Sequence, residues 1–170
     1  MKKAILAGIL GLTTLSAHAG SWNYSQTTDT MDTAFLQKNA VLTSSNKINF
    51  SFPYNGGSQG FLIINKILGT NDINLDGYHI GFMISKGQIT CANPCQIRIK
   101  FDNEKPISVY ANLSSDKNDK IRLNFLYQPN ISKDEFLSKL ISSKKFLIEP
   151  NFYQEERKVF EFSTAGFKNI

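Results

Sequence analysis

The stretch Gly87–Asp102, GQITCANPCQIRIKFD, carries the clearest structural signal in the chain. Two runs of β-forming residues, Gln88–Cys91 and Cys95–Phe101, stand on either side of the short segment Ala92–Pro94. Its proline lacks a backbone N–H, so the segment cannot continue a helix or a paired central strand. We therefore expect the two runs to fold back on each other as a hairpin. In the second run apolar and charged residues alternate, which predicts one buried and one exposed face.

The N-terminus has the pattern of a secretory signal peptide. Lys2 and Lys3 precede the uncharged apolar run Ala4–Leu15, and Ala17-His18-Ala19 matches the small-x-small cleavage pattern. We expect cleavage after Ala19, which leaves residues 20–170 as a single β-sandwich domain that is periplasmic or secreted. The alternative is an uncleaved N-terminal anchor. No later apolar run is long enough for a transmembrane helix.

Cys91 and Cys95 are the two cysteines of the sequence. In an exported chain such a pair forms a disulfide, and we expect one here that fixes the local turn. Because the closed loop is short, its contribution to stability should lie at the low end of the usual range. The C-x-x-x-C spacing differs from that of C-x-x-C redox pairs. Structural zinc needs about four ligands, and after the signal peptide only His79 could join the two cysteines.

Alternating runs separated by polar turns continue along the rest of the chain. We expect strands at Ser21–Ser25, Lys47–Phe52, Gly60–Leu68, Ile73–Ile84, Ile107–Leu113, Lys120–Phe125, Phe146–Glu149 and Val159–Phe162, with a turn at Ser44–Asn46. The expected helix is Lys133–Ser142, where Ser132 is the cap and Glu135 its capping-box partner. This order predicts a mainly β fold, an antiparallel β-sandwich or flattened barrel with one late α-helix.

No residue pattern for catalysis, cofactor binding or metal binding is complete in the sequence. His79 is the histidine available for a Ser-His-acid arrangement, and no G-x-S-x-G elbow accompanies it. Asp72, Asn74 and Asp76 copy the start of a calcium loop, but Met83 stands where the bidentate Glu should be. We therefore predict a protein that is not an enzyme and has no cofactor or metal. A hydrolase using paired carboxylates is an alternative, with Asp102, Glu149, Glu155 and Glu161 as candidates.

Aromatic residues in loops are the candidates for a binding surface, because most of the 13 Phe and 6 Tyr lie at strand-core spacing. Pro53–Gly57 is a strong loop signal, and a polar break at Gln154–Arg157 follows a second aromatic pair. Exposed aromatic rings are typical of protein interfaces. The predicted surface consists of Tyr54, Asn55, Gly56, Gly57, Phe152 and Tyr153, and Tyr127 is a further candidate for an exposed aromatic contact.

The chain also resembles a group of small secreted or lipid-anchored proteins of proteobacteria and their prophages. The resemblance rests on Trp22 with Asp29 and Asp32, FPYxG at Phe52–Gly56, GQIxC…CxIxIxFD at Gly87–Asp102 and FxFxTxGF at Phe160–Phe167. The last third of the chain also resembles the invasion-associated locus B proteins. These resemblances imply a bacterial-envelope context, often phage-linked, and no reaction. The chain differs from the lipid-anchored members because it has no cysteine at the cleavage site.

Export, the disulfide and the strand-rich pattern predict a non-enzymatic binding protein of the bacterial envelope. Its expected partner is a protein or another envelope component. The 19 Lys and Arg against 14 Asp and Glu are a mild excess spread along the chain, which does not indicate nucleic acid. A second hypothesis is a periplasmic inhibitor or phage-exclusion-type protein, which would act on an envelope enzyme or an entry step through a rigid loop at Cys91–Cys95.

Overall fold

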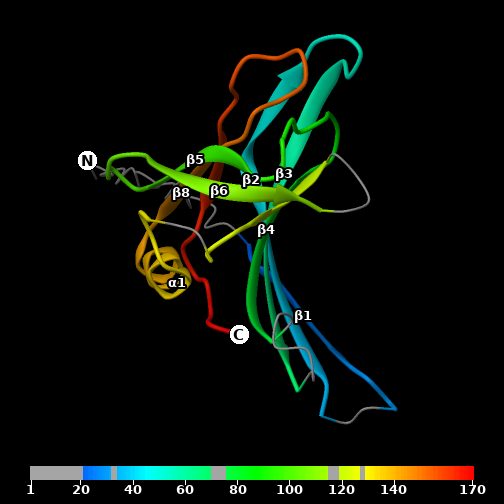
Figure 1. Ribbon diagram of the computed structural model, residues 1–170, viewed down its shortest axis with the longest axis vertical. Helices are drawn as coiled ribbons and strands as arrows, with labels where there is room; N and C mark the ends of the chain where they lie inside the picture. Colours follow the sequence, from blue (N-terminus) through cyan, green and yellow to red (C-terminus); the bar gives the residue numbers. More distant parts are fainter. Residues whose placement is uncertain (1–20, 32–33, 70–75, 115–118, 127–128) are drawn as a thin grey trace, which may run out of the picture.

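The computed structural model describes residues 21–31, 34–69, 76–114, 119–126 and 129–170 (Figure 1). Within these residues, nine strands form one antiparallel sheet in the order β1-β2-β3-β4-β7-β6-β5-β8-β9. The elements are β1 (Asn23–Thr28), β2 (Leu36–Phe50), β3 (Gly56–Leu68), β4 (Gly77–Ile84), β5 (Cys95–Phe101), β6 (Ile107–Leu113), β7 (Lys120–Leu123), α1 (Lys133–Ser142), β8 (Lys145–Glu149) and β9 (Phe160–Ser163).

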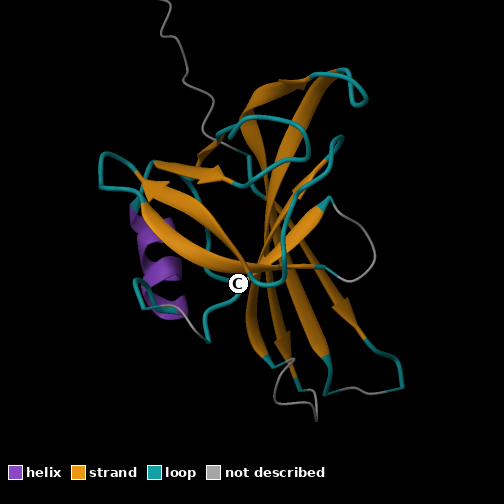
Figure 2. Cartoon of the chain, turned by 45° about the horizontal axis from the view of Figure 1, so that its top comes forward, coloured by secondary structure: helices purple, strands orange, loops and turns teal. Residues whose placement is uncertain are grey.

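The sheet curls into a half-barrel with the helix at one side of it (Figure 2), and α1 packs against β5 and β8. The prediction of a mainly β antiparallel fold with one late helix is confirmed, and the single curled sheet corresponds to the flattened barrel. The predicted signal peptide, residues 1–19, lies outside the described residues, as do Asp72 and Asn74 of the calcium-loop pattern.

Phenylalanine rings fill the inner side of the curled sheet. The ring of Phe82 in β4 lies 5.3 Å from that of Phe160 in β9, so a middle strand contacts an edge strand across the core. Near β5 and β8, Phe136 of α1 lies 5.3 Å from Phe101 and 5.5 Å from Phe146. All five rings are buried. Their packing joins the two halves of the sheet and the helix into one core.

Helix α1 begins and ends where the sequence predicts. Ser132 caps it by accepting a hydrogen bond from the backbone N–H of Glu135 at 3.1 Å. Phe136, Leu137 and Leu140 form its buried face. The helix therefore combines a polar cap with one apolar stripe, which is how short helices are stabilised against a sheet.

Side chains of β2 connect the sheet to its far edge strand, β9. A bulge between Thr43 and Lys47 interrupts the register of β2 with β3. At this bulge Asn46 Nδ2 donates to Val159 O at 2.9 Å, and Glu161 N donates to Asn46 Oδ1 at 2.9 Å. The turn predicted at Ser44–Asn46 is wrong, because the chain continues as one long strand whose bulged polar residues turn toward β9.

The hairpin predicted between Gln88–Cys91 and Cys95–Phe101 is also wrong. Strand β5 pairs with β6 on one side and with β8 on the other, so both its edges are occupied. The preceding run crosses instead to a late part of the chain, where Ile89 forms an isolated bridge with Phe152. The pairing is long-range, and the local turn signal could not reveal it.

Strands β1–β4 continue as an arm in the lower part of Figure 1, and the buried residues Ala40, Ile64 and Ile80 at its base belong to the core. We define the arm as Asn23–Thr28, Leu36–Val41, Ile63–Leu68 and Gly77–Gly81, which are paired in that order.

The end of the chain lies against the first strand of this arm. The ring of Trp22, just before β1, lies 4.5 Å from that of Phe167, and Trp22 Nε1 donates to Thr164 O at 3.2 Å. The backbone N–H of Lys168 donates to the Tyr24 hydroxyl at 2.7 Å. The early tryptophan and the closing Gly-Phe pattern thus meet in space.

Candidate functional site

The predicted surface segments, Tyr54–Gly57 and Phe152–Tyr153, come together at one end of the molecule. The β2–β3 connection and the 151–159 loop lie side by side at the top of Figure 1. Gln88 joins them, because its side-chain Oε1 accepts from the Tyr54 hydroxyl at 2.8 Å and its carbonyl accepts from Tyr153 N at 3.0 Å. We call the exposed or half-exposed residues Phe52–Gly57 and Tyr153 the tip surface.

A carboxylate forms a second link between the two loops. Glu155 Oε1 accepts a hydrogen bond from the backbone N–H of Ser51, and Lys158 Nζ lies 3.5 Å from Glu155 Oε2. The Ser51 hydrogen bond stabilises the charged carboxylate and lowers the pKa of Glu155 below its usual value, with a smaller effect from Lys158. The loop ends are therefore held by a charge-assisted bond as well as by Gln88.

The turn at the tip requires one of its two glycines. Gly56 has φ +107°, a conformation that side chains rarely adopt, and Lys86 Nζ donates to the neighbouring Asn55 carbonyl at 3.0 Å. A Cβ on Gly57 would meet only ordinary van der Waals contacts, the nearest at 3.5 Å from Asn49 Oδ1. Buried Ser58 completes the support, since its hydroxyl donates to Lys86 O at 2.7 Å.

Exposure within the two loops differs from the prediction at two phenylalanines. Phe152 is 6% exposed and packs 4.9 Å from Phe50, so its assignment to the binding surface is wrong. Its bridge to Ile89 turns it inward, and the next residue, Tyr153, turns outward and is 45% exposed.

Phe52 is the aromatic residue of the tip surface that the sequence analysis missed. Alternation in the predicted strand Lys47–Phe52 puts Phe52 on the same face as Ile48 and Phe50, but β2 ends at Phe50 and Phe52 is 81% exposed. The following Pro53 was the available signal, because a proline in a paired strand marks its end. Tyr54 is half-buried under its hydrogen bond to Gln88. Tyr127 lies outside the described residues.

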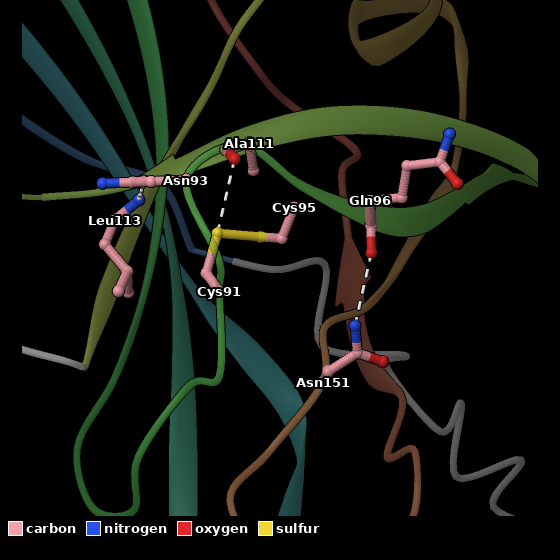
Figure 3. Close-up of a disulfide and its surroundings, with 7 residues drawn as sticks. All are labelled: Cys91, Asn93, Cys95, Gln96, Ala111, Leu113 and Asn151. Carbon is pink, nitrogen blue, oxygen red and sulfur yellow. Dashed lines mark hydrogen bonds between the residues drawn. A yellow bond between two sulfur atoms is a disulfide. The ribbon is translucent and has the colours of Figure 1, made fainter.

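The Cys91–Cys95 disulfide is formed, as predicted, and pins a short loop against β6 (Figure 3). Cys91 Sγ lies 3.4 Å from the carbonyl oxygen of Ala111. Asn93 Oδ1 accepts from the backbone N–H of Leu113 at 2.7 Å, and Ala92–Pro94 are exposed. The loop is thus held at its two cysteines and at its apex.

Each carboxylate considered for a hydrolase takes part in a structural contact. Asp102 accepts from the backbone N–H groups of Lys144 and Lys145, at 3.0 and 2.8 Å. Glu161 pairs with Lys145 Nζ at 2.7 Å, and Glu155 accepts the hydrogen bond from Ser51 N that joins the tip loops. The fourth, Glu149 of β8, pairs with Arg98 Nε, and this hydrogen bond raises the pKa of Arg98. The four carboxylates therefore link strands and loops and do not converge on one described cavity.

Among the described residues no group of three or more His, Cys, Asp or Glu side chains is placed to hold a metal ion. The same part of the chain contains no helix with the length and apolar character needed to cross a bilayer. His79 lies in β4, in register with Asn65 of β3.

No protein-family model, curated protein or solved structure matches this chain in our comparisons.

Proposed function

We propose that this chain is an exported, non-enzymatic binding protein of the bacterial envelope and that the tip surface contacts its partner. The observation that carries the proposal is the pair of exposed aromatic side chains, Phe52 at 81% and Tyr153 at 45%, on two loops that Gln88 joins. The N-terminal signal pattern and the Cys91–Cys95 disulfide support an oxidising compartment outside the cytoplasm.

The construction of the tip favours binding over a merely structural role. Aromatic side chains contribute large contact area with little loss of rotamer freedom, and they dominate the energetics of many interfaces. Loops that are already held in place lose less entropy when they bind. Here Ser51 and Tyr153 are tied through their backbone, whereas the ring of Phe52 is left largely in water. Such an exposed ring is stabilised only when a partner covers it.

The test is a pull-down from solubilised envelope extract, with the exported, disulfide-bonded protein as bait. We expect one envelope protein or component to be retained by the wild type and lost with Phe52→Ala/Tyr153→Ala. The matched control is Leu126→Ala, which removes an equally exposed apolar side chain (85%) away from the tip. Circular dichroism and thermal unfolding should be the same for all three proteins. A partner that the double variant retains, or that the control also loses, would contradict the proposal.

The inhibitor hypothesis has its own observation, the clamped and exposed loop Ala92–Pro94. A rigid exposed loop is suited to enter a groove of an envelope enzyme. Asn93 is a poor probe because its side chain holds the loop to Leu113. Ala92→Glu changes the exposed surface and leaves that bond in place. Loss of partner binding with Ala92→Glu but not with Phe52→Ala would indicate that the partner binds the Ala92–Pro94 loop and not the tip surface.

A further inference from the structure

The chain protects the two edges of its sheet differently. At β9 the backbone groups that face away from β8 are bonded by side chains. The Asn46 side chain accepts from Glu161 N and donates to Val159 O, and Ser45 Oγ donates to Glu161 O at 3.0 Å. At β1, the other edge, the Tyr24 hydroxyl bonds to Gly166 O and Lys168 N, but no described residue hydrogen-bonds the β1 backbone on the side away from β2. One edge is closed and the other is left open.

The open edge also lacks the features that normally block strand addition. Natural edge strands carry lysines, prolines or bulges that prevent pairing with another chain. Strand β1, Asn-Tyr-Ser-Gln-Thr-Thr, has no charged residue and no proline, and its register with β2 is continuous from Asn23 to Thr28. All six residues are exposed. In Figure 1 the strand forms the outer side of the arm, away from α1 and β5.

We propose that β1 pairs with β1 of a second copy of this chain, antiparallel and edge to edge, so that the two arms form one continuous sheet. A second copy fits better than a foreign strand, because β1 has no charged residue by which a strand of opposite charge would be selected. Self-pairing brings no like charges together, and hydroxyl and amide side chains stand opposite one another, where they can hydrogen-bond. The C-terminal segment contacts β1 through the Tyr24 side chain, and no described residue hydrogen-bonds the backbone of β1 on the side away from β2, where the second arm would pair.

Symmetry restricts the register of this pair. Two antiparallel edge strands in one sheet are related by a two-fold axis perpendicular to the sheet, and the axis keeps each side chain on its own face. Residues that stand opposite must share a face, so their numbers have the same parity. The axis therefore lies midway between the two copies of one residue, and for a pairing centred on β1 this residue is Ser25 or Gln26. With Ser25 at the axis Ser25 faces its own copy, and with Gln26 at the axis Ser25 faces Thr27.

The decisive variant is Ser25→Lys/Thr27→Lys. Both side chains are exposed on one face of β1, and in either register the variant places at least one pair of lysines directly opposite each other. The control, Gln96→Lys/Ser138→Lys, adds the same charge at exposed positions of β5 and α1. In sedimentation equilibrium at micromolar concentrations we expect the mass of two chains for the wild type and the control, and of one chain for the edge variant. High salt should restore part of the dimer of the edge variant, because it screens the lysine repulsion.

Cysteine cross-linking tests the geometry independently. Opposed residues of an antiparallel pair have Cα atoms about 4.5–5.5 Å apart, within the range of a disulfide. We expect either Ser25→Cys or Gln26→Cys to give a cross-linked dimer under mild oxidation, and Ser108→Cys, exposed on central strand β6, to stay uncross-linked. A wild type that is monomeric throughout, or a dimer that survives in the lysine variant without β1 cross-linking, would overturn the proposal. A monomer that gains a strand only from an added peptide would also overturn it.

Discussion

Asn46→Ala should weaken the connection between the β2 bulge and β9. The amide of Asn46 donates to Val159 O and accepts from Glu161 N, both at 2.9 Å, and so replaces one rung of a strand ladder. A typical protein hydrogen bond contributes about 1 kcal/mol net. Val159 is exposed, so water can replace the lost donor there, whereas the bond from Glu161 is partly buried and should cost more. We expect Asn46→Ala to lower the free energy of unfolding by about 2 kcal/mol.

Urea denaturation measures this change, with the slope of unfolding free energy against urea unaltered if only the native contact is lost. Amide hydrogen exchange provides a local readout, since Glu161 N–H should exchange faster in Asn46→Ala while the amides of β3 keep their protection. The matched control is Asn103→Ala, at an exposed turn after β5, which should change stability by less than about 0.5 kcal/mol. If Asn46→Ala behaves like this control in both measurements, the conclusion that the Asn46 side chain holds β2 to β9 is refuted.

Three further changes test the core, the helix cap and the tip. Phe136→Ala removes a fully buried ring that packs on Phe101 and Phe146, and should cost about 3–5 kcal/mol in urea denaturation, against less than about 0.5 kcal/mol for exposed Ile141→Ala in the same helix. Ser132→Ala removes the cap bond to Glu135 N and should cost about 1 kcal/mol, whereas Ser132→Asp should retain most of it. The hydrogen bond from Ser51 N lowers the pKa of Glu155, so its stabilising effect is present above the unfolded pKa and is lost as the pH falls through the lower folded value. The Tm of Glu155→Gln should therefore fall less steeply than the Tm of the wild type as the pH is lowered from about 6 to about 3. Equal slopes of Tm against pH would contradict the hydrogen bond assigned to Glu155.

Local patterns in the sequence were sufficient for the elements that depend on neighbouring residues. Helix α1 has the predicted bounds, because cap, capping box and apolar stripe all lie within Ser132–Ser142. Strand β6 also matches its prediction from Ile107 to Leu113, where the alternation is clean. The disulfide formed as expected, since four residues of separation leave the two cysteines close whatever the rest of the chain does.

Pairing between distant segments was not predictable from the same patterns. The proline turn at Pro94 correctly indicated a break, but the run before it bonds to Asn151 and Phe152 instead of to β5. Alternation tells which side chains share a face, and it contains no information about which strand lies alongside. The tip illustrates the consequence, because both loops were identified but the burial of two phenylalanines was not. Phe52 is exposed and Phe152 is buried, the opposite of the prediction, since the burial of each depends on where a strand pairing stops.

Amide side chains make several of the connections that the sequence could not reveal. Gln88 joins the two tip loops, Asn46 joins the β2 bulge to β9, and Asn93 fixes the disulfide loop to β6. In a sequence Asn46 and Asn93 look like ordinary turn formers, because Asn favours turns for local reasons, and Gln88 looks like part of a strand. An amide carries both a donor and an acceptor, so it can replace a missing backbone group wherever a strand ladder stops. β1 differs in this respect. Side chains complete the backbone hydrogen bonding at β9 and in the tip loops, whereas no described residue hydrogen-bonds the backbone on the outer side of β1. If lysines at Ser25 and Thr27 leave the association state unchanged, that contrast has no functional meaning and the open edge is simply hydrated.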